Sequence, residues 1–354
     1  MKTYLSCALF CLSLSATSAH ATSIELGGFL KANARYVDGN IAFQDSWSGG
    51  GRVVDPAKRT QFSAQESRFN VKLNHDQIFG FAEIDFVDSS QGNPIISNSY
   101  APRLRHAFIQ YQGITAGQTW STLVNTSSFA ETADLGGPLV GQAMVRQTLF
   151  RYSTPHWQFA LENPYTYGTT AQQNEDKAQW IDTSNDYLPD TIIRYNQAGD
   201  WGNVSVSALI RYLDANDSKQ WGSGLSVGAK LFTFRRDDLR LQLHYGNLGR
   251  YVGTDASRDI IEGEIETSLS GMFAYRHFWS ERSRSTIFYG RTTTKVEQTD
   301  RYHWGVNLFT DLTPALSVGI EFGRYEIQDT STDTTAPSPR GASNYAQLSM
   351  QFSL

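Results

Sequence analysis

The sequence predicts a transmembrane antiparallel β-barrel of about 16 strands. Three observations support this fold class. Apolar and polar residues alternate with period two along most of the chain, short and long connections alternate between these segments, and no run of about 18 apolar residues offers a membrane helix. An even strand count with alternating connections places every short turn, and both chain termini, on one side of the membrane. That layout is typical of bacterial outer-membrane barrels, with short periplasmic turns and long extracellular loops.

The chain begins with the leader MKTYLSCALFCLSLSATSAHA, which has one lysine, an apolar run and small residues at its end. This pattern predicts a secretory signal peptide cleaved after Ala21, so residues 1–21 are the signal and residues 22–354 form the barrel domain. Both cysteines, Cys7 and Cys11, lie in the leader, and the barrel is therefore expected to contain no disulfide. The net charge of −5 argues against a nucleic-acid partner.

The first expected strand shows the alternation clearly. Residues 24–36 place leucine, alanine and tyrosine on one face, and lysine, asparagine and arginine on the other. The same pattern returns at 66–74, 204–212, 239–245 and 346–354. The short turns are expected near 74–77, 112–113, 154–156, 199–202, 235–238, 279–283 and 311–314. The long loops are expected at 38–60, 88–101, 122–143, 163–189, 213–222, 246–262, 293–301 and 327–342.

The segment RLRHAF places Arg103 and Arg105 on one face of an expected strand. Facing lipid at mid-membrane, each arginine would cost about 2–4 kcal/mol, whereas a barrel of about 16 strands encloses water. We therefore expect the polar faces to line a pore that favours anions. The expected pore-lining residues are Lys31, Arg35, Arg68, Lys72, Arg103, Arg105, Arg151, Arg194, Arg211 and Arg276. Alternatively, several of these arginines pair with Glu83, Asp85 or Glu162 on neighbouring strands.

The loop LVNTSSFAETADLGGPLVGQ at 123–142 is long, rich in small residues and modestly charged. Such a loop can fold into the barrel and narrow it, with Gly136, Gly137 and Pro138 shaping the turn back. Glu131 and Asp134 would then face the basic wall and create a transverse field. The alternative is a loop that lies on the outer surface of the barrel.

Five ordered blocks, RLRHAF, AGQTWSTL, ETADLGGP, RQTLFRYST and ALENP, together resemble the DcaP-type porins of Gram-negative bacteria. The upstream QESRFNVKL also fits that family. The resemblance implies a trimeric 16-stranded porin that admits small anions, with dicarboxylates as the associated substrates. It further implies that Arg68, Arg103, Arg105 and Arg151 line the passage and that residues 131–138 are the constriction loop. Unlike many members, the chain shows no helical segment before the first strand, so barrel walls alone would hold a trimer.

Two other function classes are considered. Residues 224–228 read GLSVG and match the G-x-S-x-G pattern of a hydrolase nucleophile, but the segment continues as a strand where that motif needs a strand–turn–helix. A surface adhesin or binding barrel without channel activity is the second alternative. We predict a non-enzymatic outer-membrane porin for small anionic solutes, di- or tricarboxylates in particular. It would be a homotrimer in contact with membrane lipid and lipopolysaccharide, with no cofactor and no metal.

Overall fold

A computed structural model describes most of the chain after the leader. The described residues are 22–48, 50, 53–87, 91–93, 97–168, 179–180, 186–215, 218–253, 256–261, 263–329 and 340–354. The predicted signal peptide lies outside them. Among the described residues, no helix is long and apolar enough to cross a membrane.

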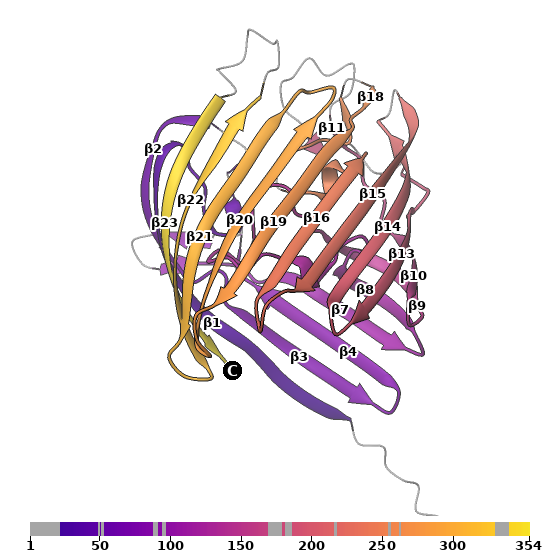
Figure 1. Ribbon diagram of the computed structural model, residues 1–354. Coiled ribbons are helices and arrows are strands. Elements are labelled where there is room, and N and C mark those ends of the chain that lie inside the picture. Colours follow the sequence, from indigo (N-terminus) through magenta and orange to yellow (C-terminus); the bar gives the residue numbers. More distant parts are fainter. Residues whose placement is uncertain are drawn as a thin grey trace, which may run out of the picture.

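One antiparallel sheet of 17 strands forms the body of the molecule (Figure 1). β2 pairs with the second half of β1 and β3 with its first half, so these two strands share one position in a closed barrel of 16. Pairing of β1 with the last strand, β23, closes the barrel. The strands are β1 (Ser23–Ile41), β2 (Val53–Ser63), β3 (Arg68–His75), β4 (Ile78–Asp85), β7 (Arg103–Tyr111), β8 (Ile114–Trp120), β9 (Arg146–Ser153), β10 (Trp157–Glu162), β13 (Asp190–Gly199), β14 (Gly202–Asp214), β15 (Lys219–Phe232), β16 (Asp238–Gly246), β19 (Ser268–Phe278), β20 (Ser283–Thr294), β21 (Asp300–Asp311), β22 (Leu316–Gln328) and β23 (Arg340–Ser353).

Short strands outside the barrel belong to its long connections. They are β5 (Gln91–Asn93) with β6 (Ser97–Ser99), and a small sheet of β11 (Tyr167–Gly168), β12 (Gln179–Trp180), β17 (Ile260–Ile261) and β18 (Glu264–Ile265). The described residues also include three 3-10 turns, η1 (Asp45–Trp47), η2 (Thr126–Ser128) and η4 (Gly249–Tyr251). The short hairpin turns and the C-terminus lie together at the lower end of Figure 1, as the connection lengths predict.

The period-two pattern is confirmed on the outer surface, where large apolar side chains such as Leu26, Leu30 and Phe62 are exposed. Strand β7 departs from simple alternation. The pairing of β4 with β7 shifts between Glu83 and Ile84, so Arg105 and His106 are both buried. Such a bulge inserts one extra residue and reverses the faces beyond it. Arg103 and Arg105 therefore do share the inner face.

Part of the interior is apolar, contrary to the expectation of a polar inner face throughout. Where β1, β22 and β23 reach their loop ends, Val37, Tyr325 and Tyr345 pack with Trp47 of η1 and with Leu139. Leu139 belongs to the long connection between β8 and β9. The inward faces of these strands can be apolar because that connection covers them and keeps water away.

Candidate functional site in the barrel interior

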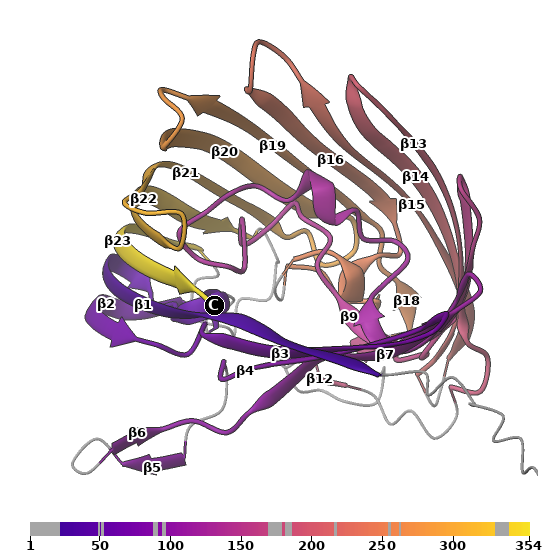
Figure 2. The same cartoon turned by 90° about the horizontal axis from the view of Figure 1, so that it is seen from below.

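The connection between β8 and β9, residues 121–145, runs across the inside of the barrel (Figure 2). Its backbone is fastened to several strands. Ala133 N–H donates to Glu321 on β22 at 2.8 Å, and Ala143 N–H donates to Gln242 on β16 at 2.9 Å. The side chain of Asn125 reaches β14 and β15, and Leu139 N–H donates to His303 on β21. We call residues 121–145 the inner loop. Because backbone groups inside a protein need partners, these bonds allow an irregular segment to lie in the barrel.

The two acidic residues of the inner loop are already paired. Glu131 binds Arg276 at 3.1 Å and Arg284 at 2.8 Å, and Asp134 binds Arg35. We predicted that both carboxylates would face an open basic wall and create a transverse field. The structure instead places each of them in direct contact with its counter-ion, so most of their charge is compensated locally.

Gly136, Gly137 and Pro138 lie where the inner loop turns back. Gly137 has a φ of +71°, a left-handed conformation that favours glycine, and its carbonyl accepts a hydrogen bond from the Trp47 indole. Gly136 N–H donates to the Asp134 carboxylate at 2.7 Å, and Pro138 packs beside Gly290 on β20. The segment is therefore held against the wall.

Arg103 and Arg105 face carboxylates. Arg103 binds Asp85 through two bonds of 2.8 Å, while Arg105 binds Glu83 and Asp85, also at 2.8 Å each. Asp85 therefore lies between both guanidinium groups. For these two arginines the alternative of cross-strand pairing holds.

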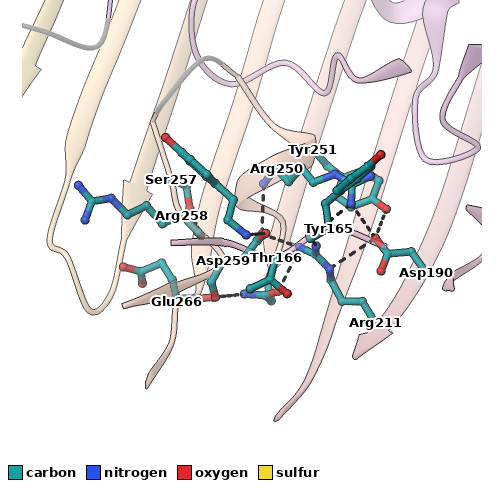
Figure 3. Close-up of polar contacts among 12 residues, drawn as sticks. Tyr165, Thr166, Asp190, Arg211, Arg250, Tyr251, Ser257, Arg258, Asp259 and Glu266 are labelled. Carbon is teal, nitrogen blue, oxygen red and sulfur yellow. Dashed lines mark hydrogen bonds and ion pairs between the residues drawn. The ribbon is translucent and has the colours of Figure 1, made fainter. Parts of the chain in front are cut away.

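Three other expected pore-lining residues are buried away from the lumen. Lys31 binds Glu66 and the carbonyl of Ala133, and Arg35 lies between Asp134 and Asp45. Arg211 lies in a polar network beneath the loops, with Asp190 at 3.5 Å and contacts to Asp259 and the Tyr165 carbonyl (Figure 3). The three are only 4%, 2% and 1% exposed. The expectation that they line the pore is thus wrong, because the inner loop and the neighbouring connections cover them.

Lys72 and Arg276 also have acidic partners. Lys72 lies near the turn end of β3, half exposed and 3.6 Å from Glu25. Arg276 contacts Asp238 at 2.6 Å in addition to Glu131. Both retain some access to the interior, but their charge is partly compensated.

Four arginines on the wall beside the inner loop have no carboxylate within ion-pair distance among the described residues. Arg68 lies on β3, Arg146 and Arg151 on β9, and Arg194 on β13. We call these four the free arginine row. Arg68 stacks on Phe29 and Arg146 on Trp120, at 5.3 Å and 4.4 Å from the ring centroids. These two aromatic rings are electron-rich but uncharged.

The other two members bind backbone oxygens of the inner loop and its approach. Arg151 Nη1 donates to the Trp120 carbonyl at 3.4 Å, and Arg194 Nη1 donates to the Val124 carbonyl. The Nε atoms of Arg68 and Arg151 are buried without any partner among the described atoms. The row therefore keeps both positive charge and unused donors.

Arg146 was not among the residues expected in the pore. It is offset from Arg151 by an odd number of positions, and simple alternation would place it on the lipid face. The signal that could have revealed it is its place beside the inner loop, where a charged side chain on the outer face of the strand is improbable.

The acidic residues of the interior are hydrogen-bonded, some to cations and some to neutral groups. Glu162 accepts bonds from Thr122 N–H and from Gln147, and Asp238 binds Arg240 and Arg276. Glu321 accepts from Asn307 and Tyr345 as well as from the inner loop. Asp238 is therefore paired with cations, whereas the donors to Glu162 and Glu321 are neutral groups. The free arginine row concentrates positive charge on β3, β9 and β13.

Neither the protein-family models nor the curated proteins contain a match to this chain. Several solved structures do match it. The outer-membrane channel DcaP of Acinetobacter baumannii is 17% identical, with a TM-score of 0.77 over 95% of this chain and 99% of that chain. An anion-selective porin from Comamonas acidovorans is 12% identical, with a TM-score of 0.59 over 94% and 100%. Salmonella typhi OmpF in complex with daunomycin is 11% identical, with a TM-score of 0.58 over 94% and 97%.

At these identities the likeness concerns the fold. It spans nearly the full length of both chains in each comparison, and it includes the closed barrel described above. The chain therefore has the 16-stranded barrel fold of the outer-membrane porins, and it shares that fold with the DcaP channel.

Proposed function

We propose that this protein is an outer-membrane porin through which small anionic solutes, in particular di- and tricarboxylates, diffuse passively. The fold and its likeness to porins support the membrane location and the channel. The free arginine row carries the anion preference, because its four guanidinium groups have no carboxylate within ion-pair distance among the described residues and two of them keep an unused donor. A passive channel requires no cofactor.

The position of the inner loop supports a path along this row. The loop is fastened to β1, β14, β15, β16, β20, β21 and β22, and Arg194 on β13 also donates to it. Among the described residues, Arg68 on β3 and Arg151 on β9 make no hydrogen bond to residues 121–145. An anion passing between the inner loop and this wall would meet guanidinium groups in succession. Arginine binds carboxylates through two parallel hydrogen bonds, so a solute with two carboxylates can engage two members of the row at once.

A homotrimer is proposed as the assembly, in contact with outer-membrane lipid and lipopolysaccharide. The strands β3, β4 and β7 to β10 have nine residues or fewer, whereas β14, β15 and β19 to β23 have eleven or more. A wall of short strands suits contact with a neighbouring subunit better than contact with a full bilayer. Near this wall the β5–β6 hairpin projects away from the barrel (Figure 2).

The hydrolase alternative rests on Ser226, the serine of the GLSVG segment. Ser226 lies within β15, which is paired on both sides, and its hydroxyl contacts His244 at 2.9 Å. Both residues are buried, and the second ring nitrogen of His244 contacts the amide of Gln242 at 3.1 Å. A triad needs a carboxylate at that place and a serine that substrate can reach. This geometry favours a structural role for the pair.

The decisive experiment is planar-bilayer conductance of the purified protein in a salt gradient, with and without succinate. We expect stepwise channels, a reversal potential that shows anion preference, and transient closures caused by succinate. The preference should decrease between 0.1 M and 1 M salt, because the screening length falls from about 10 Å to about 3 Å. Cation-selective channels would contradict the role of the free arginine row, and a folded protein without channels would contradict the porin function.

A further inference from the structure

An open groove of about 550 Å³ lies on the outside of the barrel, over β16, β19 and β20. Its position is set by Gly271, which pairs with Leu243 on one side and with Arg291 on the other. Because Gly271 has no side chain, the apolar surface is interrupted there. Leu269 and Phe273, two residues away in either direction on β19, form the ends of the depression.

The walls of the groove are apolar and exposed. Leu243, Leu269, Phe273 and Tyr289 retain between 41% and 55% of their accessible surface. Its volume lies in the range of about 300–1,000 Å³ that is usual for ligand sites. On the outer face of a membrane barrel such a depression is filled by hydrocarbon.

A cationic group lies at one end of the groove. Arg291 binds Asp300 through Nε and Nη2, at 2.9 Å and 2.8 Å, and its side chain is 53% exposed. Its Nη1 has no partner among the described residues, so it can still donate to an anionic group. Asp300 holds the guanidinium in place without occupying all of its donors.

The strand register gives the depth of the site. Gly271 is the fourth residue of β19 from the end that joins the long loops, and Arg291 is the fourth from the corresponding end of β20. In the proposed orientation this end faces the cell exterior. Arg291 thus lies near the headgroup level of the outer leaflet, and the apolar walls lie directly below it.

We propose that this groove is a binding site for lipopolysaccharide, with one acyl chain of lipid A against Gly271 and a phosphate at Arg291. The inference rests on the proposed outer-membrane location. An apolar groove that ends in a guanidinium group with a free donor matches a lipid whose acyl chains begin beside a phosphate. A second copy of the chain is the competing occupant.

The test uses the Gly271→Phe variant. A Cβ atom at Gly271 would meet its nearest neighbours at 3.4 Å and 3.7 Å, which are ordinary contacts, so the barrel should accept the substitution. The phenyl group would fill the groove. Val206→Phe on β14 is the matched control, since Val206 is 46% exposed on the outer face and lies outside the groove.

Detergent-solubilised full-length protein is titrated with purified lipopolysaccharide or with phosphatidylethanolamine, and bound lipid is counted by native mass spectrometry. We expect wild type and Val206→Phe to bind lipopolysaccharide preferentially, and Gly271→Phe and Arg291→Gln to lose most of this binding. Equal binding by Gly271→Phe, or equal binding of both lipids by wild type, would overturn the proposal. A smaller assembly for Gly271→Phe in size-exclusion chromatography would also overturn it, in favour of a subunit contact.

The same preparations distinguish failure of the groove proposal from failure of the proposed porin function. If wild type forms channels and retains SDS-resistant structure until boiled, a negative lipid result contradicts only the groove. If wild type does neither, the outer-membrane function is contradicted first.

Discussion

At the scale of single residues, the behaviour of each interior arginine depends on its nearest carboxylate. The alternating pattern predicts that Arg105 and Arg151 both face the interior. Arg105 contacts Glu83 and Asp85, however, whereas Arg151 contacts a backbone carbonyl. A guanidinium held between two carboxylates adds little net potential to the pore. One that meets only carbonyl oxygens keeps its charge available to solute.

This difference leads to a residue-scale prediction. The double substitution Arg151→Gln and Arg194→Gln should shift the reversal potential in a salt gradient toward cations, because it removes two uncompensated charges. Lys58→Gln is the control, since Lys58 lies in the middle of β2, is exposed and pairs with Asp38 at 3.5 Å. The measurement is bilayer selectivity. A shift no larger than that of Lys58→Gln would contradict the role of these arginines.

At the scale of elements, the inner loop determines the free cross-section of the barrel. It approaches the wall closely at Gly141, which has a φ of +87° and whose missing Cβ would lie 2.1 Å from the Gly271 carbonyl oxygen. Backbone contact of this kind is possible only without a side chain. Gly141 N–H also donates to Thr292 at 3.2 Å. This part of the loop therefore lies directly on the barrel wall.

Gly141→Ala should displace the inner loop from β19 and β20, since the added methyl group would collide with backbone. We expect altered single-channel conductance with additional current noise, while the barrel itself remains folded. Gly80→Ala is the matched control: a Cβ there meets Leu73 at an ordinary 3.4 Å on the outside of β4. Identical conductance traces for the two variants would show that the loop does not limit the current.

At the scale of the whole molecule, closure of the sheet pairs β1 on both of its edges. β1 pairs with β23 over residues 29–39, and with β2 and β3 on its other side. A closed barrel exposes no unpaired edge to lipid or detergent, which makes partial unfolding costly. The barrel therefore unfolds only when many strand pairings break together.

Closure predicts heat-dependent mobility in SDS gels. Unboiled protein should migrate as a compact species or as a trimer, and boiled protein at the mobility of the unfolded single chain. Removing residues 344–354 deletes the part of β23 that closes the sheet, and this truncated chain should migrate identically with and without boiling. If the truncated chain kept the mobility difference, closure through β23 would not be what stabilises the barrel.

The sequence by itself determined the strand number, the side of the short turns and the outward apolar face. These properties follow from local rules, because side chains alternate with period two and turn chemistry is local. The composition of residues 123–142 and the family resemblance also predicted that this loop folds into the barrel. In contrast, the pairing of Arg103 and Arg105 with Asp85 depends on the register between β4 and β7, including a bulge that alternation does not reveal.

Only the tertiary structure decided which cationic residues reach the lumen. Lys31, Arg35 and Arg211 have the correct parity, but the inner loop and the loop network cover them. Arg146 has the wrong parity and still joins the free arginine row, because its strand begins where the inner loop ends. Water access in a barrel depends on where an irregular loop lies, and that position is set by contacts between residues far apart in the chain.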